Sequence, residues 1–227
     1  MLFASAPSTP GYEVKFQRVG VAGGADLQIR SLLDRQQFCD PEGLALAEGI
    51  SSATWPLFGL LWPSAQKLAD LMQAWELDGK RILEMGCGLA LASLVIHRRE
   101  GQVTASDCHP LTEGFLKANL KLNGMSPLPY ATGHWGRHNL RLGRFDLIVA
   151  SDVLYERSHP KQLAGFIEAH AADGAEVLIV DPNRGNRSAF HREMASLGFS
   201  LTELALSAPL EDLSPYRGRL LHYQRLR

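Results

Sequence analysis

Paired cysteines are missing from this sequence. It has only 3 cysteines among 227 residues, Cys39, Cys87 and Cys108, and none of them forms a Cys-x-x-Cys motif. An odd number of cysteines without close pairing excludes a disulfide-stapled scaffold and is typical of a reducing compartment. We therefore expect each thiol to be a small buried packing group.

Long apolar runs and an excess of one charge are missing as well. No apolar run approaches the roughly 20 residues of a membrane span. The stretch MLFASAPSTPGYEVKF has no basic or apolar region of the kind that makes a secretory or transit signal. Lys+Arg is 23 and Asp+Glu is 24, and the formal net charge of -1 argues against a nucleic-acid binder. We expect a cytoplasmic monomer with no nucleic-acid or membrane partner.

Short β-like segments alternate with longer helical patterns along most of the chain. The expected strands are 81–85, 102–107, 126–132, 145–151 and 175–181, with closing β-like runs at 199–206 and 219–225, and the expected helices are 63–75, 89–99, 111–122, 160–171 and 188–197. This alternation is the βα pattern of an α/β fold with a Rossmann-like, doubly wound, mostly parallel sheet. We expect the closing runs to form a hairpin-like pair at the edge of the sheet.

The beginning of the chain is patterned differently. Two β-like runs between residues 12 and 30 flank Val21-Ala-Gly-Gly-Ala25, which predicts a hairpin with a glycine-rich turn. The region up to Thr54 has little further pattern. We therefore expect two units, an N-terminal extension with a β-hairpin over residues 1–54 and an α/β domain over residues 55–227.

The stretch RILEMGCGLALASL, residues 81–94, joins the first of these parallel strands to a helix through two glycines. Gly86 can make a tight turn, and Gly88 allows the backbone to approach a ligand closely. The free N–H groups at the start of the helix can bind a phosphate or a carboxylate. A purely structural turn is the alternative.

Two acids narrow the choice of ligand. Asp107 ends the next strand, where an acid either binds a ribose diol or caps the following helix. Leu91 stands where a dinucleotide fingerprint has Gly or Ala, and no Lys-Ser/Thr follows the loop as in a phosphate-binding P-loop. A carboxylate at Glu84 would repel a pyrophosphate but attract an ammonium or a sulfonium. These features favour S-adenosylmethionine as the cofactor.

Three segments together resemble a known family. Glu84-Met-Gly-Cys-Gly88, Asp107 and Ala150-Ser-Asp-Val-Leu-Tyr155 each follow a strand. They resemble motifs of the seven-strand, class I S-adenosylmethionine-dependent methyltransferases. More narrowly, they resemble the protein-lysine methyltransferase group with an Asp-x-x-Tyr signature (methyltransferase family 16) and its bacterial relatives. The resemblance implies a seven-stranded sheet with an antiparallel edge strand.

The resemblance also implies a set of site residues. The segment ending at Trp62 is similar to one whose tryptophan lies near the cofactor, and the stretch around Trp135 is similar to one that lines the adenine. The chain has Ala90 in place of a third glycine, and His134 where an acid often precedes the tryptophan. The implied cofactor-binding residues are Trp62, Glu84, Gly86, Gly88, Asp107, Cys108, Trp135 and Ser151, and the implied catalytic residues are Asp152 and Tyr155.

Methyl transfer depends mainly on holding the nucleophile and the methyl group in near-attack geometry, and it needs no metal. Asp152 can attract and orient a cationic amine, and Tyr155 can offer it a ring face or a hydroxyl. Alternatively, Asp152 caps a helix and Tyr155 is a core aromatic. Asp181-Pro-Asn-Arg184 either borders the acceptor pocket or is an ordinary turn.

A metal site is not expected. His134 and His138 are four residues apart, but Gly133 and Gly136 argue against a helix there and no third ligand is suitably spaced.

The sequence therefore predicts an enzyme, an S-adenosylmethionine-dependent N-methyltransferase that acts on a lysine side chain of a partner protein. Two alternatives stay open. A small-molecule N-methyltransferase should have an active site that is closed over, and a non-catalytic domain would bind only a cofactor or a partner. A hydrolase is excluded because no Gly-x-Ser-x-Gly elbow is present.

Overall fold

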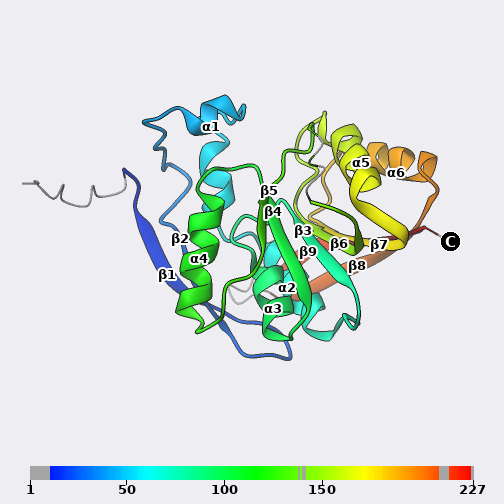
Figure 1. Ribbon diagram of the computed structural model, residues 1–227, viewed down its shortest axis with the longest axis horizontal. Helices are drawn as coiled ribbons and strands as arrows, with labels where there is room; N and C mark the ends of the chain where they lie inside the picture. The colour runs from blue at the N-terminus through cyan, green and yellow to red at the C-terminus, as the bar shows by residue number, and fades with distance from the viewer. Residues whose placement is uncertain (1–10, 138, 140–141, 210–214, 226–227) are drawn as a thin grey trace, which may run out of the picture.

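In the computed structural model, which describes residues 11–137, 139, 142–209 and 215–225, a seven-stranded sheet forms the centre of the molecule (Figure 1). The strands lie in the order β5-β4-β3-β6-β7-β9-β8. They span Arg81–Met85 (β3), Gln102–Asp107 (β4), Tyr130–Thr132 (β5), Phe145–Ser151 (β6), Ala171–Asp181 (β7), Phe199–Pro209 (β8) and Pro215–Arg225 (β9). The chain runs outward from β3 to β5 and then crosses to β6 on the other side of β3, and such a reversal is where doubly wound sheets bind ligands.

Helices cover both faces of this sheet. α2 (Pro63–Ala74), α3 (Leu91–Arg98) and α4 (Thr112–Leu122) pack on one face, and α5 (His159–His170) and α6 (Arg187–Ser196) pack on the other. Ile82 of β3 packs with the first group and Leu83 with the second. Strands buried on both faces need near-continuous apolar runs, which explains why β3 and β6 read RILEM and FDLIVAS. The predicted fold class is confirmed.

The closing pair of strands differs from the expectation in one detail. β9 runs antiparallel to both β7 and β8 and lies between them, so the antiparallel strand is one position in from the edge. The side chains explain this order. β9 supplies Leu221 and Tyr223, which are fully buried, whereas β8 carries Thr202 and Glu203 on the exposed edge.

The predicted N-terminal hairpin is present and packs against α4. Its strands are β1 (Val14–Val19) and β2 (Leu27–Leu32). Asn119 Oδ1 accepts a hydrogen bond from the Arg30 backbone N at 2.7 Å, and Asn123 Oδ1 accepts one from the Gln28 N at 2.9 Å. Because the hairpin shares its hydrophobic core with α2 and α4, the division of the chain at residue 54 stays a prediction.

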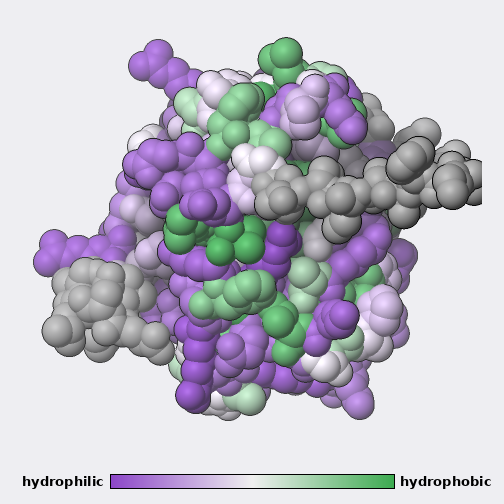
Figure 2. All heavy atoms as spheres, turned by 90° about the vertical axis from the view of Figure 1, so that its left-hand side faces the viewer, coloured by the Kyte–Doolittle hydropathy of each residue, from purple (hydrophilic) through white to green (hydrophobic). Residues whose placement is uncertain are grey.

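Two short helices in the same region were not predicted. They are α1 (Leu44–Ala47) and the 3-10 helix η1 (Trp55–Gly59), which are too short to show an apolar period. Asp40 orients α1 by accepting hydrogen bonds from the backbone N of Ala45 and Leu46. Figure 2 shows this side of the molecule, on which apolar side chains lie among hydrophilic ones. Among the described residues, no helix is both long and apolar enough to cross a membrane.

Candidate functional site

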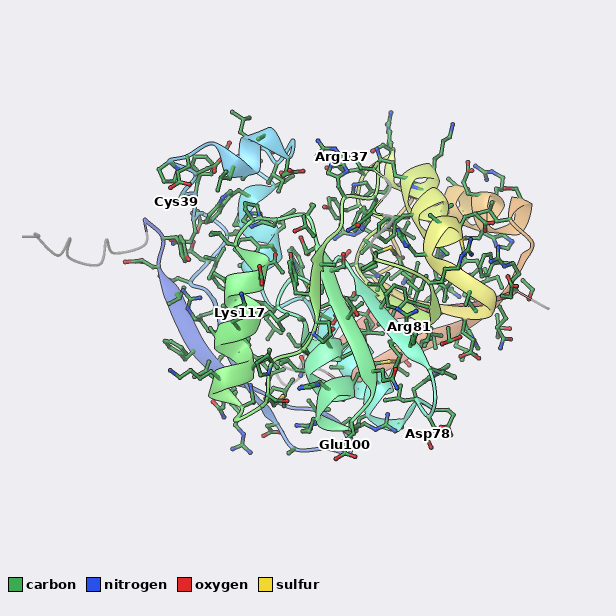
Figure 3. All side chains as sticks on the ribbon, in the orientation of Figure 1. Cys39, Asp78, Arg81, Glu100, Lys117 and Arg137 are labelled. Carbon is green, nitrogen blue, oxygen red and sulfur yellow. The ribbon has the colours of Figure 1, made fainter. Side chains whose placement is uncertain are left out.

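The carboxyl ends of four parallel strands meet at one edge of the sheet. β3, β4, β6 and β7 run in the same direction and end at Met85, Asp107, Ser151 and Asp181. In Figure 3, Arg137 lies at this end of the molecule, whereas Asp78 and Glu100, which precede β3 and β4, lie at the opposite end. The topology therefore brings residues from separate sequence motifs to one place.

The glycine turn after β3 leaves no room for side chains. Gly86 and Gly88 have φ angles of 64° and 51°, in the left-handed region that favours glycine. A Cβ atom on Gly86 would lie 2.7 Å from Cζ2 of Trp135 and 3.1 Å from Val153, and one on Gly88 would lie 2.9 Å from the Phe58 carbonyl oxygen. The turn thus lies directly against the Trp135 loop on one side and η1 on the other.

Asp107 ties β4 to this turn. Its Oδ2 accepts a hydrogen bond from Gly88 N at 2.9 Å, and its Oδ1 accepts one from His109 N at 2.9 Å. Burial raises the pKa of the Asp107 carboxyl group, against the effect of these backbone hydrogen bonds. The side chain does not cap α4, which begins without a side-chain cap. Because each carboxylate oxygen can accept more than one hydrogen bond, the group keeps acceptor capacity for a ribose diol.

Glu84 is a buried acid beside the turn, with 2% of its surface exposed. Its Oε2 accepts a hydrogen bond from Ser93 N in α3 at 2.7 Å. Desolvation is the main cause that raises the pKa of Glu84 to about 7. In the part of the chain that the structure describes, no lysine, arginine or histidine forms an ion pair with it. A buried acid without a cationic partner, two residues before Gly86, fits a cationic ligand such as the ammonium or sulfonium of S-adenosylmethionine.

We predict that S-adenosylmethionine binds more tightly at pH 8 than at pH 6. With a pKa of about 7, Glu84 is mostly protonated at pH 6, and a bound cation favours the carboxylate form. The affinity should therefore rise up to about tenfold across this range. Isothermal titration calorimetry at several pH values measures it, and Glu84→Gln, which keeps the size but cannot titrate, should abolish this part of the pH dependence.

Glu84→Gln also tests, without any ligand, whether burial raises the pKa of Glu84. Since the pKa of Glu84 rises from 4.5 to about 7 on folding, the folded state binds more protons within this window, and stability falls as the pH rises through it. The free energy of unfolding of Glu84→Gln, relative to the wild type, should increase by about 3 kcal/mol between pH 4 and pH 8. A difference that stays constant with pH would contradict the burial argument.

Asp152 and Tyr155 lie just beyond the end of β6. Asp152 has a φ of 54°, and its backbone N donates a hydrogen bond to Val180 O of β7 at 2.9 Å. Its carboxylate accepts two hydrogen bonds from Arg184, from Nε at 2.8 Å and from Nη2 at 3.0 Å. The Asp152 side chain is only 10% exposed, whereas Tyr155 is 42% exposed. The pair therefore combines a carboxylate that is fixed by hydrogen bonds with a solvent-exposed aromatic ring.

Neither packing alternative for this pair agrees with the structure. α5 begins after Ser158 without a side-chain cap, so Asp152 is not the cap of that helix. The exposure of Tyr155 does not fit a core aromatic.

His159 is not among the residues predicted for the site, but it contacts two of them. Its ring lies edge-on to Trp135, with centroids 5.0 Å apart, and edge-on to Tyr155, with centroids 4.4 Å apart. Its Nδ1 hydrogen-bonds with the Val153 carbonyl oxygen at 2.8 Å, and burial lowers the pKa of the imidazole. A neutral His159 thus connects a predicted cofactor residue with a predicted catalytic one. No motif in the sequence indicates this, because the contact depends on where α5 begins.

The remaining predicted cofactor residues are Trp62, Cys108 and Ser151, and their contacts do not by themselves indicate a ligand. Trp62 is half-buried, and its Nε1 donates a hydrogen bond to Leu57 O at 2.9 Å. Cys108 and Ser151 are half-buried at the ends of β4 and β6, and burial raises the pKa of the Cys108 thiol to about 12. The cofactor roles of these three residues stay predictions.

A cavity of about 510 Å³ opens beside Trp135, between its loop and the start of α5; among its lining residues are Trp135, Arg137, Arg157, Lys161 and Phe166. Arg137 Nη1 also pairs with Glu48 Oε2 at 3.1 Å, which connects this loop with the segment after α1. Within the described ranges, no three His, Cys, Asp or Glu side chains are grouped as metal ligands. His138 lies outside the described residues.

Known proteins resemble this chain in sequence. It matches the family described as lysine methyltransferase over residues 48–196. It is 33% identical over 157 residues to the calmodulin-lysine N-methyltransferase of Arabidopsis thaliana. It is 30% identical over 162 residues to the electron transfer flavoprotein beta subunit lysine methyltransferase of Rattus norvegicus. These matches cover 63% and 69% of this chain but only 52% and 62% of the two relatives, so the chain spans between half and two thirds of their length.

Solved structures resemble it in fold. The magnesium protoporphyrin IX methyltransferase from Synechocystis, with bound S-adenosylmethionine, has a TM-score of 0.58 at 15% identity and covers 83% of this chain and 100% of its own. A methyltransferase from Pyrococcus furiosus has a TM-score of 0.58 at 16% identity and covers 84% of this chain and 100% of its own. At these identities the likeness concerns the fold alone.

Proposed function

This chain belongs to the lysine methyltransferase family, and from that premise we propose that it transfers a methyl group from S-adenosylmethionine to the side-chain nitrogen of a lysine in a partner protein. When bound, S-adenosylmethionine supplies a methyl group on a positively charged sulfur. The residues of this chain then have to bind the cofactor, orient the lysine nitrogen and let the protein substrate approach.

The arrangement of Asp152 and Tyr155 carries this proposal. Both follow β6 at the edge of the sheet where the glycine turn also lies. The Asp152 carboxylate is held in place by the hydrogen bonds that it accepts from Arg184, and it can accept a further hydrogen bond from the lysine side chain and so orient its nitrogen. The exposed ring of Tyr155 can contact the methylenes or the cationic head of the same lysine.

The cofactor residues in this proposal surround the glycine turn. Glu84 attracts the cationic groups of the cofactor, and Asp107 accepts hydrogen bonds from its ribose. Gly86 and Gly88 let the backbone approach it. Trp135, which lies against Gly86, provides an aromatic wall for the adenine.

The exposure of the acceptor side favours a protein substrate over a small amine. Tyr155 is 42% exposed, and the Arg184 side chain is 39% exposed. A site for a small molecule should be covered, because closing an active site excludes water and surrounds the substrate. An open site leaves room for a lysine on the surface of a folded partner.

A methylation assay tests the proposal. Purified protein is incubated with radiolabelled S-adenosylmethionine and a cell lysate, and the Asp152→Asn variant serves as the control. We expect a labelled protein band with the wild type that is absent with the variant, and mass spectrometry should locate the methyl group on a lysine. Label in small metabolites alone would identify a small-molecule enzyme, and no label would indicate a non-catalytic binding domain.

We propose further that the protein acts as a monomer in the cytoplasm. The free cysteines Cys39, Cys87 and Cys108 suit a reducing compartment. We also propose that residues 55–227 are the catalytic domain and that residues 1–54 are an extension to it. The packing of η1 against Gly88 supports a role for the segment at this boundary in completing the cofactor site.

A further inference from the structure

Arg184 and Asp152 form a two-point contact at the acceptor side of the site. The guanidinium donates from Nε to Oδ1 at 2.8 Å and from Nη2 to Oδ2 at 3.0 Å. Two parallel hydrogen bonds of this kind fix the plane of a carboxylate as well as its position. Both oxygens of Asp152 are therefore oriented by one side chain, which the strand-end position of Asp152 alone would not achieve.

The loop after β7 is built to hold Arg184 in this place. The backbone N of Arg184 donates to Asp181 Oδ1 at 2.8 Å. Asn183, with a φ of 67°, donates from Nδ2 to the Arg217 carbonyl oxygen at 3.1 Å. The loop is thus fixed at two points. The Arg184 side chain is 39% exposed, whereas that of Asp152 is 10% exposed.

An unpaired carboxylate at this place would oppose the reaction that it helps to orient. A lysine arrives as an ammonium, but only its neutral amine has the lone pair that forms the new N–C bond. A lone anion next to the nitrogen would stabilise the ammonium and hold its proton. A permanent cation beside the anion cancels this effect, and arginine stays charged at every pH that the enzyme meets.

Building on the proposed function, we propose that Arg184 is a positioning residue with two roles. It orients the Asp152 carboxylate, and its charge keeps the acceptor lysine in the neutral, nucleophilic form. The proton released by the lysine leaves to solvent on the exposed side of the site. The amine lone pair then forms the N–C bond while the electrons of the broken C–S bond return to sulfur.

Other titratable groups near this pair do not replace Arg184. Tyr155, Asp181 and Tyr216 all interact electrostatically with Asp152 or Arg184. None of these three side chains can carry a positive charge. Among the described residues, Arg184 is the cation that pairs with Asp152.

The test compares Arg184→Gln with Arg184→Lys and with Arg187→Gln. Arg187 lies on the same segment but pairs with Asn183 and Glu203 instead of Asp152, so its variant is a matched control.

Initial rates are measured between pH 6.5 and 10 on the lysate protein that the wild type labels. With Arg184→Gln we expect kcat at pH 7.5 to fall at least about tenfold and its pH profile to move up by about one unit or more. KM for the acceptor should stay unchanged or fall. Arg184→Lys keeps the positive charge but cannot make the two parallel hydrogen bonds of the guanidinium. This variant should keep the wild-type pH profile with a lower kcat.

A second measurement does not depend on turnover. The ligand is an unmethylated peptide that contains the target lysine identified by mass spectrometry. Calorimetry in buffers of different ionisation enthalpy counts the protons that are released when this peptide binds to the complex of the protein with S-adenosylhomocysteine. At pH 8 we expect the wild type and Arg187→Gln to release the same number of protons per peptide, and Arg184→Gln to release measurably fewer. Affinity for S-adenosylhomocysteine should be the same in all of them.

The outcomes separate this inference from the proposed function. If the wild type labels no protein, the proposed function fails and the inference fails with it. If the wild type labels a lysine but Arg184→Gln loses activity equally at every pH, or releases as many protons as the wild type, Arg184 is only structural. A faster Arg184→Gln enzyme would mean that Arg184 blocks Asp152 instead of assisting it, which also overturns the inference.

Discussion

Asp152→Asn is expected to lower methyl transfer by at least about 100-fold while the affinity for S-adenosylhomocysteine stays within a few-fold of the wild type. The amide keeps the size of the side chain but has no charge, and it presents an oxygen to only one of the two Arg184 nitrogens that now bind both carboxylate oxygens. It therefore loses the fixed orientation that the acceptor nitrogen needs. Single-turnover rates with radiolabelled cofactor, together with calorimetry of S-adenosylhomocysteine binding, measure the two quantities separately.

The choice of asparagine follows from the backbone. Asp152 has a φ of 54°, and asparagine tolerates the left-handed region better than other non-glycine residues. Asp152→Ala would add backbone strain of about 1–2 kcal/mol and would leave Arg184 without its partner, so a loss of activity could reflect local unfolding. Undiminished turnover by Asp152→Asn, with normal thermal stability, would remove Asp152 from the proposed mechanism.

Gly86→Ala is expected to weaken the binding of S-adenosylmethionine more than tenfold and to destabilise the protein by more than the backbone alone explains. Gly86 has a φ of 64°, so alanine costs about 1–2 kcal/mol in backbone strain. The new Cβ would also lie 2.7 Å from Cζ2 of Trp135, and the indole must move. Since Trp135 is the proposed wall of the adenine site, this movement should reduce cofactor affinity, which calorimetry measures, while chemical denaturation measures the loss of stability.

A second glycine, Gly79, separates the cost of backbone strain from the cost of the contact with Trp135. Gly79 has a φ of 69°, and a Cβ built on it meets nothing within 4 Å. Gly79→Ala should therefore show the backbone cost alone, with unchanged cofactor affinity. In the double variant Gly86→Ala, Trp135→Ala, the contact is gone, so the loss of stability should be smaller than the sum of the single losses. Additive losses would mean that Trp135 does not lie against the turn in solution.

The alternation of strand and helix patterns predicted the fold class, the resemblance of three motifs predicted the family, and the comparisons confirm both. β3 could be identified because Ile82, Leu83 and Met85 make a short, mostly apolar segment that ends at a glycine turn, as expected for a strand buried on both faces. The glycine turn could be identified because the left-handed angles of Gly86 and Gly88 exclude most other residues. Asp107, Asp152 and Tyr155 could be placed at one edge because parallel strands end on the same side.

Only the tertiary structure decided which of these groups touch and what fixes them. Arg184 meets Asp152, and His159 contacts both Trp135 and Tyr155, because loops after different strands converge. The sequence positions of these residues carry no periodicity or spacing that reports such a contact. The inner position of β9 depends in the same way on which strand buries more apolar surface against β7. The conformational preference of a short segment depends on neighbouring residues, so a local pattern can predict it. The contacts described here depend on packing between segments that are far apart in the chain, so no local pattern predicts them.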